Sequence, residues 1–234
     1  MIYVLHYAPD NASAIIRIAL LELDLSFDTR LFDRRIKALG AGAFFELNPS
    51  EHIPVLETGR DVLFETGSIL LWLADRHMAL APKLDEAEKD PFLNWLFWFS
   101  NMLQPALSMP FQSETYLGQL TEETVQDLRE AQKISLAILF MQIDQETSSR
   151  YGRRLNSILN IFQIYMKVCL RWVYLYLSKD ETDWFDLNTR PNPLRLYQKM
   201  ESRKRGTGAA CAEEQEHAIF SNPSRPNPPQ GSAP

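Results

Sequence analysis

The first eighty residues alternate short apolar runs of strand length with stretches of helical periodicity. The pattern predicts strands at 2–7, 26–32, 53–57 and 62–64, and helices at 14–23, 37–47 and 66–77. Arg17 and Glu22 are expected on the solvent side of the first helix. The two strands at 53–64 are spaced as a hairpin, joined at Thr58-Gly59-Arg60-Asp61. Helical crossovers followed by a hairpin predict a mixed sheet with helices on its faces.

After residue 81 the strand pattern stops and only helical spacing continues. The pattern predicts helices over 90–102, 121–145, 158–177 and 192–200, with Ser157 as the cap of the third. Pro105 is expected to end or kink the first of these helices. We therefore expect an N-terminal domain at 1–80, a linker at 81–90, an all-helical domain at 91–220 and a poorly ordered proline-rich tail at 221–234.

The apolar stretch 158–177 is long enough to be tested as a membrane span. Lys167 and Arg171 stand near its middle, where each charge costs ~2.5–3.5 kcal/mol in a bilayer. We therefore predict a helix buried in a protein core, and no association with a membrane. The N-terminus lacks a basic start and a long apolar run, so no signal peptide is expected and the chain is interpreted as cytoplasmic.

Composition narrows the possible functions. The 234 residues are 45% hydrophobic, enough for a core, and the net charge of −6 argues against nucleic acid as a partner. The two cysteines, Cys169 and Cys211, form neither a disulfide framework nor a metal-binding cluster. His6 and His77 lack metal-ligand spacing, so we predict no metal site.

Two motifs give a more specific indication. They read Asn-Pro-Ser-Glu-His-Ile-Pro-Val-Leu at 48–56, then Phe-Glu-Thr-Gly-Ser-Ile-Leu at 64–70 and Leu-Ala-Asp at 73–75. Their identity and spacing resemble the N-P-x-G-x-V/I-P-x-L and E-S-x-A-I-x-x-Y-L-A motifs of cytosolic, bacterial-type glutathione S-transferases. The resemblance implies an α/β thioredoxin-like N-terminal domain (βαβαββα, mixed sheet) followed by an all-α C-terminal domain, usually in a homodimer.

The same resemblance implies a binding site for reduced glutathione, a co-substrate rather than a permanently bound cofactor. Ile53, before a cis Pro54, would offer its backbone to the cysteinyl unit, and Glu65 with Thr66 would hold the γ-glutamyl end. His52, Arg35 or Lys37 could meet the glycine carboxylate, and the sequence does not choose among them. Glu51 departs from the family, which has glycine at that position.

The chemistry needs a donor that stabilises the glutathione thiolate. A free thiol has a pKa near ~8.5, and lowering it by ~2 units needs ~2.7 kcal/mol. One charge-assisted hydrogen bond at a helix N-terminus provides about that much. Ser13, where the first helix starts, is the expected donor, and Asn11 and Tyr7 are the alternatives; a plain helix-capping role is the other interpretation of Ser13. Ala12 stands where one bacterial class has cysteine, so a mixed disulfide with a protein cysteine is not expected.

The sequence therefore predicts a glutathione transferase that attacks an apolar electrophile. Met102, Leu103, Met109, Phe111 and Tyr116 could line the electrophile pocket or be ordinary packing residues. Trp95 and Trp98 could serve the core or a homodimer face, and Cys169 is expected in the core. The open alternatives are glutathione-dependent peroxide or disulfide reduction, and a non-catalytic glutathione-fold binding or regulatory protein.

Overall fold

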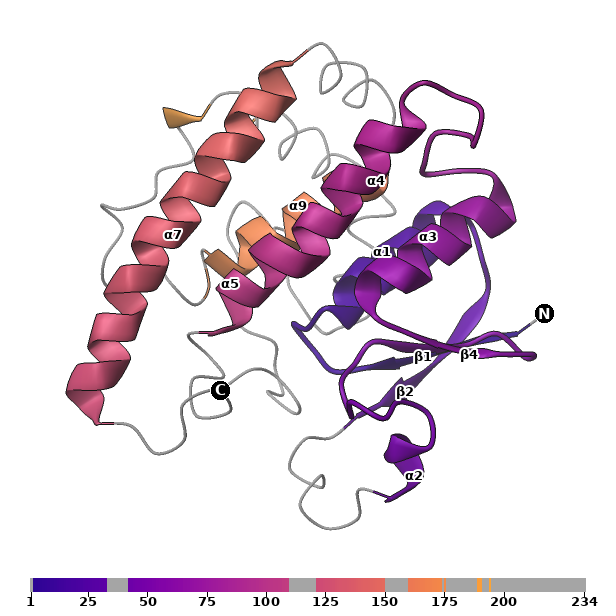
Figure 1. Ribbon diagram of the computed structural model, residues 1–234. Helices are drawn as coiled ribbons and strands as arrows, with labels where there is room; N and C mark the ends of the chain where they lie inside the picture. The colour runs from indigo at the N-terminus through magenta and orange to yellow at the C-terminus, as the bar shows by residue number, and fades with distance from the viewer. Residues whose placement is uncertain are drawn as a thin grey trace. The chain divides into compact units, whose positions relative to one another are not determined.

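The computed structural model describes residues 2–32, 42–109, 121–149, 160–173, 175, 189–190 and 194 (Figure 1). The chain divides into two compact units, one made of Met1–Lys89 with Glu201–Pro234 and the other of Asp90–Met200. We call them the N-terminal unit and the C-terminal unit and describe each by itself. The boundary between Lys89 and Asp90 falls within the stretch 81–90 that the sequence indicates as a linker.

The N-terminal unit is built on a four-stranded mixed sheet. Its strands are β1 (Tyr3–Tyr7), β2 (Phe27–Leu31), β3 (Val55–Glu57) and β4 (Val62–Phe64), in the order β2-β1-β3-β4. β1 pairs with β2 in parallel, and the other two pairings are antiparallel, which confirms the predicted mixed sheet. Strand β2 lies at an edge of the sheet and, apart from a half-buried Phe27, is exposed, so its predicted half-buried alternation is wrong.

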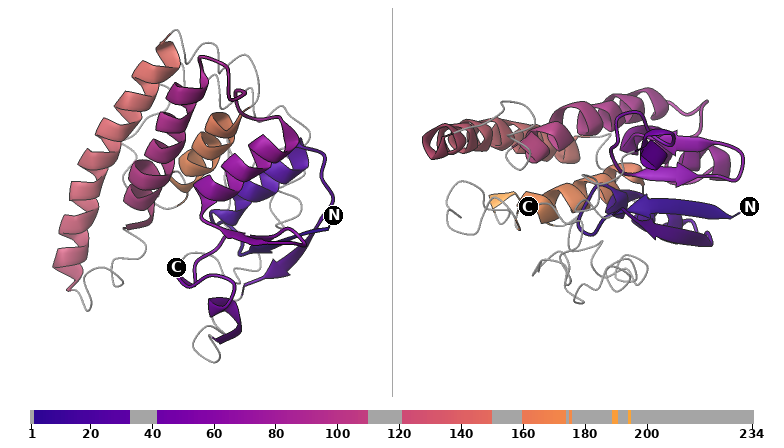
Figure 2. Two further views of the ribbon diagram at one scale, coloured as in Figure 1. Left: turned by 45° about the vertical axis from the view of Figure 1, so that its right-hand side comes forward. Right: turned by 90° about the horizontal axis from the view of Figure 1, so that it is seen from below.

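Helices cover both faces of this sheet. α1 (Ser13–Glu22) and α3 (Thr66–His77) lie together on one face, and the short α2 (Gly42–Phe45) lies on the other (Figures 1 and 2). The face toward α1 and α3 carries Leu5 and Leu56, both fully buried. The helix predicted over 37–47 is described only as α2, and residues 37–41 lie outside the described part.

The C-terminal unit is helical throughout its described part. It comprises α4 (Lys89–Trp98), a π-helical turn η2 (Phe99–Leu103), α5 (Gln104–Ser108), α7 (Glu122–Ser148) and α9 (Ile161–Trp172). The long α7 runs beside α4 and α5 (Figure 2). Its N-cap is Thr121, whose hydroxyl accepts a hydrogen bond from the Thr124 N–H.

The chain stays helical through Pro105, so this proline does not end the helical stretch. Proline has no N–H and its ring collides with the carbonyl four residues earlier in a regular α-helix. The chain adapts by widening one turn, so that the Gln104 N–H bonds to the Phe99 carbonyl five residues back. The expected end of the helix is thus replaced by a π turn.

Helix α9 forms the centre of the C-terminal unit. All twelve of its residues are buried, including Lys167 and Arg171, as predicted for a core helix. Its cap is Asn160, whose side chain accepts from the Gln163 N–H; Ser157, the expected cap, lies outside the described residues. Trp95 packs edge-on against Phe162 of this helix, which places that tryptophan in the aromatic core. No helix among the described residues is long and apolar enough to cross a bilayer.

Candidate functional site

Strand register brings three predicted segments to one edge of the sheet. His6 of β1 pairs with Val55 of β3, and Val55 pairs with Phe64 of β4. The chain leaves β1 at this row toward the loop 8–12, enters β3 from the peptide 53–54, and leaves β4 into the dipeptide 65–66. The register therefore brings the starts of α1 and α3 and the Ile53-Pro54 peptide to the same edge.

The loop before α1 is closed by Ser13. Its hydroxyl donates to the Ala8 carbonyl at 3.1 Å and accepts from the Ala8 N–H at 3.3 Å. Both residues are fully buried. Ser13 is the first helical residue rather than the cap, and Ala12 occupies the cap position without a side-chain hydrogen bond. A role for Ser13 as the helix cap is therefore wrong, and its single hydroxyl proton is already engaged.

Asn11 differs from every other side chain of this loop. Residues 8, 9, 10, 12 and 13 are buried, whereas Asn11 is only half-buried. Its backbone carbonyl accepts from Ala14, but its side-chain amide makes no hydrogen bond to a described residue, and the amide oxygen is itself buried. A buried polar atom without a partner costs roughly 1–3 kcal/mol. The buried oxygen can accept a hydrogen bond from a ligand, and the amide hydrogens, which bond to no described residue, can donate one.

Tyr7, the last residue of β1, lies beneath a buried cation. The guanidinium carbon of Arg17 is 4.5 Å from the centre of the Tyr7 ring. Arg17 is 4% exposed, so its expected position on the solvent side of α1 is wrong. The apolar spacing that indicated a helix did not reveal that α1 is buried on nearly all sides.

The peptide between Ile53 and Pro54 is cis, as predicted, and both residues are buried. The loop before it is braced by Asn48, which is 1% exposed. Its amide nitrogen donates to the His52 carbonyl at 2.7 Å, and its amide oxygen accepts from the Ser50 N–H at 3.0 Å. The His52 side chain is exposed. In the sequence, Asn48 is only the first residue of the motif at 48–56, and the motif does not reveal this bracing role.

The start of α3 has the features expected of an anion-binding helix end. Glu65 occupies the cap position at φ 68°, ψ 123°, and its exposed side chain makes no capping hydrogen bond. Non-glycine residues in such conformations cost about 1–3 kcal/mol and cluster at ligand-binding positions. Thr66 is 4% exposed, and its hydroxyl bonds to no described residue. The first N–H groups of α3 are thus not satisfied by the Glu65 side chain.

Glu51 adopts a left-handed conformation, with φ at 52°. Only glycine visits this region without a steric penalty of about 1–2 kcal/mol. This backbone conformation suits the glycine that the motif resembled by residues 48–56 has at this position, although this chain has glutamate.

The residues considered for the electrophile pocket differ from one another in burial and contacts. Leu103 is fully buried in the core, Met102 is 52% exposed, and Met109 accepts a hydrogen bond from Gln132. Phe111 and Tyr116 lie outside the described residues, as do Arg35 and Lys37 of the glycine-carboxylate set. No electrophile pocket is defined by the described residues.

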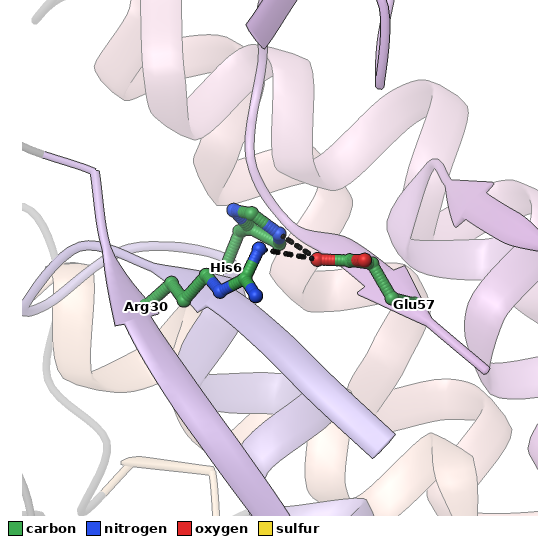
Figure 3. A network of polar contacts seen from close by, with 3 residues as sticks. All are labelled: His6, Arg30 and Glu57. Atoms are coloured by element: carbon green, nitrogen blue, oxygen red, sulfur yellow. Dashed lines mark hydrogen bonds and ion pairs between the residues drawn. The ribbon is translucent and has the colours of Figure 1, made fainter. Parts of the chain in front are cut away.

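Two further sets of polar contacts lie on the two faces of the sheet in the N-terminal unit. On the α2 face of the sheet, His6 Nε2 lies 2.7 Å from Glu57 Oε1, and Arg30 donates to the same oxygen at 3.1 Å (Figure 3). On the α3 face the Tyr3 hydroxyl and His77 Nε2 are 3.0 Å apart. No group of His, Cys, Asp and Glu among the described residues could hold a metal ion.

Cys169 lies inside α9 and is completely buried, as predicted. Burial raises the pKa of the Cys169 thiol far above its usual range. Because the thiolate is the reactive form of cysteine, Cys169 is unsuited to covalent chemistry.

Comparison with known proteins shows what this chain resembles. Residues 12–76 match the family model for the glutathione S-transferase N-terminal domain. An uncharacterized GST-like protein of Streptococcus mutans is 46% identical over 59 residues, 24% of this chain and 22% of that protein. The disulfide-bond oxidoreductase YghU of Escherichia coli is 39% identical over 62 residues, 25% of this chain and 21% of that protein.

The similarity to these two curated relatives thus spans about a fifth of their length. A solved sphingomonad glutathione S-transferase, complexed with glutathione, superposes with a TM-score of 0.71 at 23% identity, over 89% of this chain and 98% of that one. At that identity the likeness shows the fold. The chain therefore has the glutathione S-transferase fold, and its residues 12–76 belong to the N-terminal domain of the glutathione S-transferase family, as the motifs predicted.

Proposed function

We propose that this protein is a glutathione transferase that binds reduced glutathione at the sheet edge formed by Tyr7–Ser13, Ile53-Pro54 and Glu65-Thr66. The observation that supports this most strongly is the register that brings these three segments together. A tripeptide with a thiol, an ammonium and two carboxylates needs a backbone partner, an anion site and a donor for sulfur. The three segments supply one of each.

The ends of glutathione are assigned from the chemistry of each segment. The uncapped N-terminus of α3, with the Thr66 N–H and hydroxyl, receives the γ-glutamyl carboxylate, and the exposed Glu65 carboxylate pairs with the neighbouring ammonium. The backbone of Ile53 pairs with the cysteinyl unit as a strand edge would. His52, exposed on the adjacent loop, is the described candidate for the glycine carboxylate.

We assign the donor to sulfur to Asn11, with Ser13 as the alternative. Ser13 can donate to a thiolate only after releasing the Ala8 carbonyl, which would leave a buried acceptor without a partner. Asn11 has two amide hydrogens, and its side-chain amide makes no hydrogen bond to a described residue. The start of α1 adds about 0.3–1 kcal/mol for a nearby anion. Ser13 then serves to hold the loop in place.

The reaction follows from ionisation and proximity. The thiol proton leaves to solvent, and the thiolate sulfur forms a bond to an apolar electrophile, whose leaving group departs or whose double bond accepts the electron pair. No base in the protein is required. Glutathione-dependent disulfide reduction is the second candidate, because part of this domain is similar to a protein named a disulfide-bond oxidoreductase.

A homodimer forms part of the proposal. Helix α7 presents Ile134, Ile138 and Met141, which are 67%, 49% and 47% exposed, at helical spacings of four and three residues. Such a stripe on a long surface helix is typical of a face that packs against another helix. Light scattering after size-exclusion chromatography should give twice the 27.0 kDa chain mass, and I138E should shift it to the monomer.

Ultraviolet difference absorption of bound glutathione tests the enzymatic proposal. The wild-type protein should show thiolate absorption at neutral pH, and N11A should reduce it strongly while glutathione affinity stays within a few-fold. N94A, which removes an exposed asparagine from α4, is the matched control and should behave as wild type. Binding without a thiolate signal in the wild type would instead indicate a non-catalytic binding protein. Turnover of an aryl halide compared with that of a mixed disulfide separates the two reactions.

A further inference from the structure

One buried charge beside the candidate site is not used by the function proposed above. Arg17 is 4% exposed, and arginine stays protonated at every accessible pH. A full positive charge is therefore fixed inside the N-terminal unit. Burying a charge costs desolvation free energy, so the position of Arg17 calls for an explanation.

Helix geometry places this charge behind the loop that precedes α1. Arg17 stands four residues after Ser13, on the same face of α1, and helical side chains lean toward the helix N-terminus. The contact with Tyr7 confirms that direction, because Tyr7 is the residue from which the chain leaves β1 toward the loop. The guanidinium thus stacks on the residue from which the chain enters the loop that precedes α1.

We infer that Arg17 is a positioning residue with an electrostatic role: its fixed charge favours the ionised sulfur of glutathione bound at the start of α1. This inference rests on the proposed function. Arg17 acts through space and through Tyr7, whose ring it holds, rather than by touching the sulfur. Water screens the interaction between two charges much less when one of them is buried in the protein than when both lie at the surface.

Charges on the neighbouring elements decide the net effect. Asp10, 3% exposed, is the acidic side chain of the same loop and opposes Arg17. On β1, the titratable residue in contact with Arg17 is Tyr7. Both Asp10 and Arg17 already have polar or ring contacts within the protein, so the inference concerns the added effect of the Arg17 charge on the sulfur.

The test is a pH titration of the thiolate absorption of protein-bound glutathione. R17M removes the charge and keeps the length of the side chain, R17K keeps the charge, and R30M removes a mostly exposed arginine from β2 as the control. We expect R17M to raise the apparent pKa of the bound thiol by about 1 unit, since a nearby opposite charge shifts a pKa by about 1–3 units. R17K and R30M should both stay close to wild type.

The outcomes separate the two claims. If the wild type ionises bound glutathione and R17M titrates at the same pH, the role of Arg17 is overturned while the proposed function stands. If the wild type shows an ordinary thiol pKa, both are overturned. If R17M fails to fold, R17Q takes its place as the neutral variant, and a titration of R17Q that matches R17K overturns the inference.

Discussion

The Ser13 hydroxyl is bonded twice to one residue, donating to the Ala8 carbonyl and accepting from the Ala8 N–H. This pair closes the loop that carries Asn11, and both partners are fully buried. The Ser13 hydroxyl therefore stabilises the conformation of the loop, and this structural role comes before any role in catalysis. Removal of the Ser13 hydroxyl should mainly lower the stability of the protein, whereas removal of the Asn11 amide should mainly reduce the thiolate absorption of bound glutathione.

S13A should lower the stability of the protein more than its thiolate chemistry. The variant leaves the buried Ala8 N–H and carbonyl unsatisfied, which costs about 1–3 kcal/mol. Urea unfolding monitored by circular dichroism measures this loss. S135A removes an exposed serine hydroxyl from α7 and should change the unfolding free energy by less than about 0.5 kcal/mol. Equal stability of S13A and S135A would show that the Ala8 contacts are not important.

E65Q should weaken glutathione binding and leave the fold unchanged. The Glu65 side chain is exposed and makes no capping hydrogen bond, so its charge is free for a ligand. Loss of one charge-assisted hydrogen bond of about 1.5–3 kcal/mol corresponds to roughly 10- to 100-fold weaker binding. Isothermal titration with reduced glutathione measures it, with D85N, an exposed acid of the interdomain stretch, as control. Unchanged affinity in E65Q would contradict the placement of the γ-glutamyl end.

The sheet, the order of its elements and helix α3 could be predicted from the sequence because local patterns carry them. The same patterns could not show that Arg17 is buried, since burial on all sides of α1 depends on tertiary packing. They could not show the π turn at Pro105 either, because a proline that breaks one helix can be accommodated in another. For the candidate site, the cis Ile53-Pro54 peptide followed from a family motif, whereas the Ser13–Ala8 contact depends on loop geometry that no spacing encodes.

E51G should stabilise the protein or leave it unchanged, unlike most substitutions by glycine. Glu51 has φ at 52°, where a side chain costs about 1–2 kcal/mol, and glycine relieves that strain at an entropic cost of about 0.5–1 kcal/mol. S50G, one residue earlier, brings the entropic cost without the relief and should be destabilising. Thermal unfolding of the two variants compares them directly. A melting temperature of E51G below that of S50G would refute the strain argument.

His77 should make stability fall in mild acid. Burial, and then the charge of Arg76, lower the pKa of His77 below its usual 6.5. Below pH 6.5 the unfolded chain takes up a proton that the folded protein resists, so stability decreases as pH falls from 6.5 toward the folded pKa and is constant above it. H77Q should flatten this part of the profile in melting temperatures measured between neutral and mildly acidic pH. An unchanged slope in H77Q would assign the acid sensitivity to another group.

The crystal structure of the protein soaked with reduced glutathione tests the central proposal most directly. The proposal predicts the sulfur within hydrogen-bonding distance of the Asn11 amide nitrogen, the cysteinyl backbone paired with Ile53, and the γ-glutamyl carboxylate at the start of α3. A sulfur bonded to the Ser13 or Tyr7 hydroxyl with Asn11 turned away would contradict the assignment of the donor. Glutathione bound away from this sheet edge would contradict the proposed site altogether.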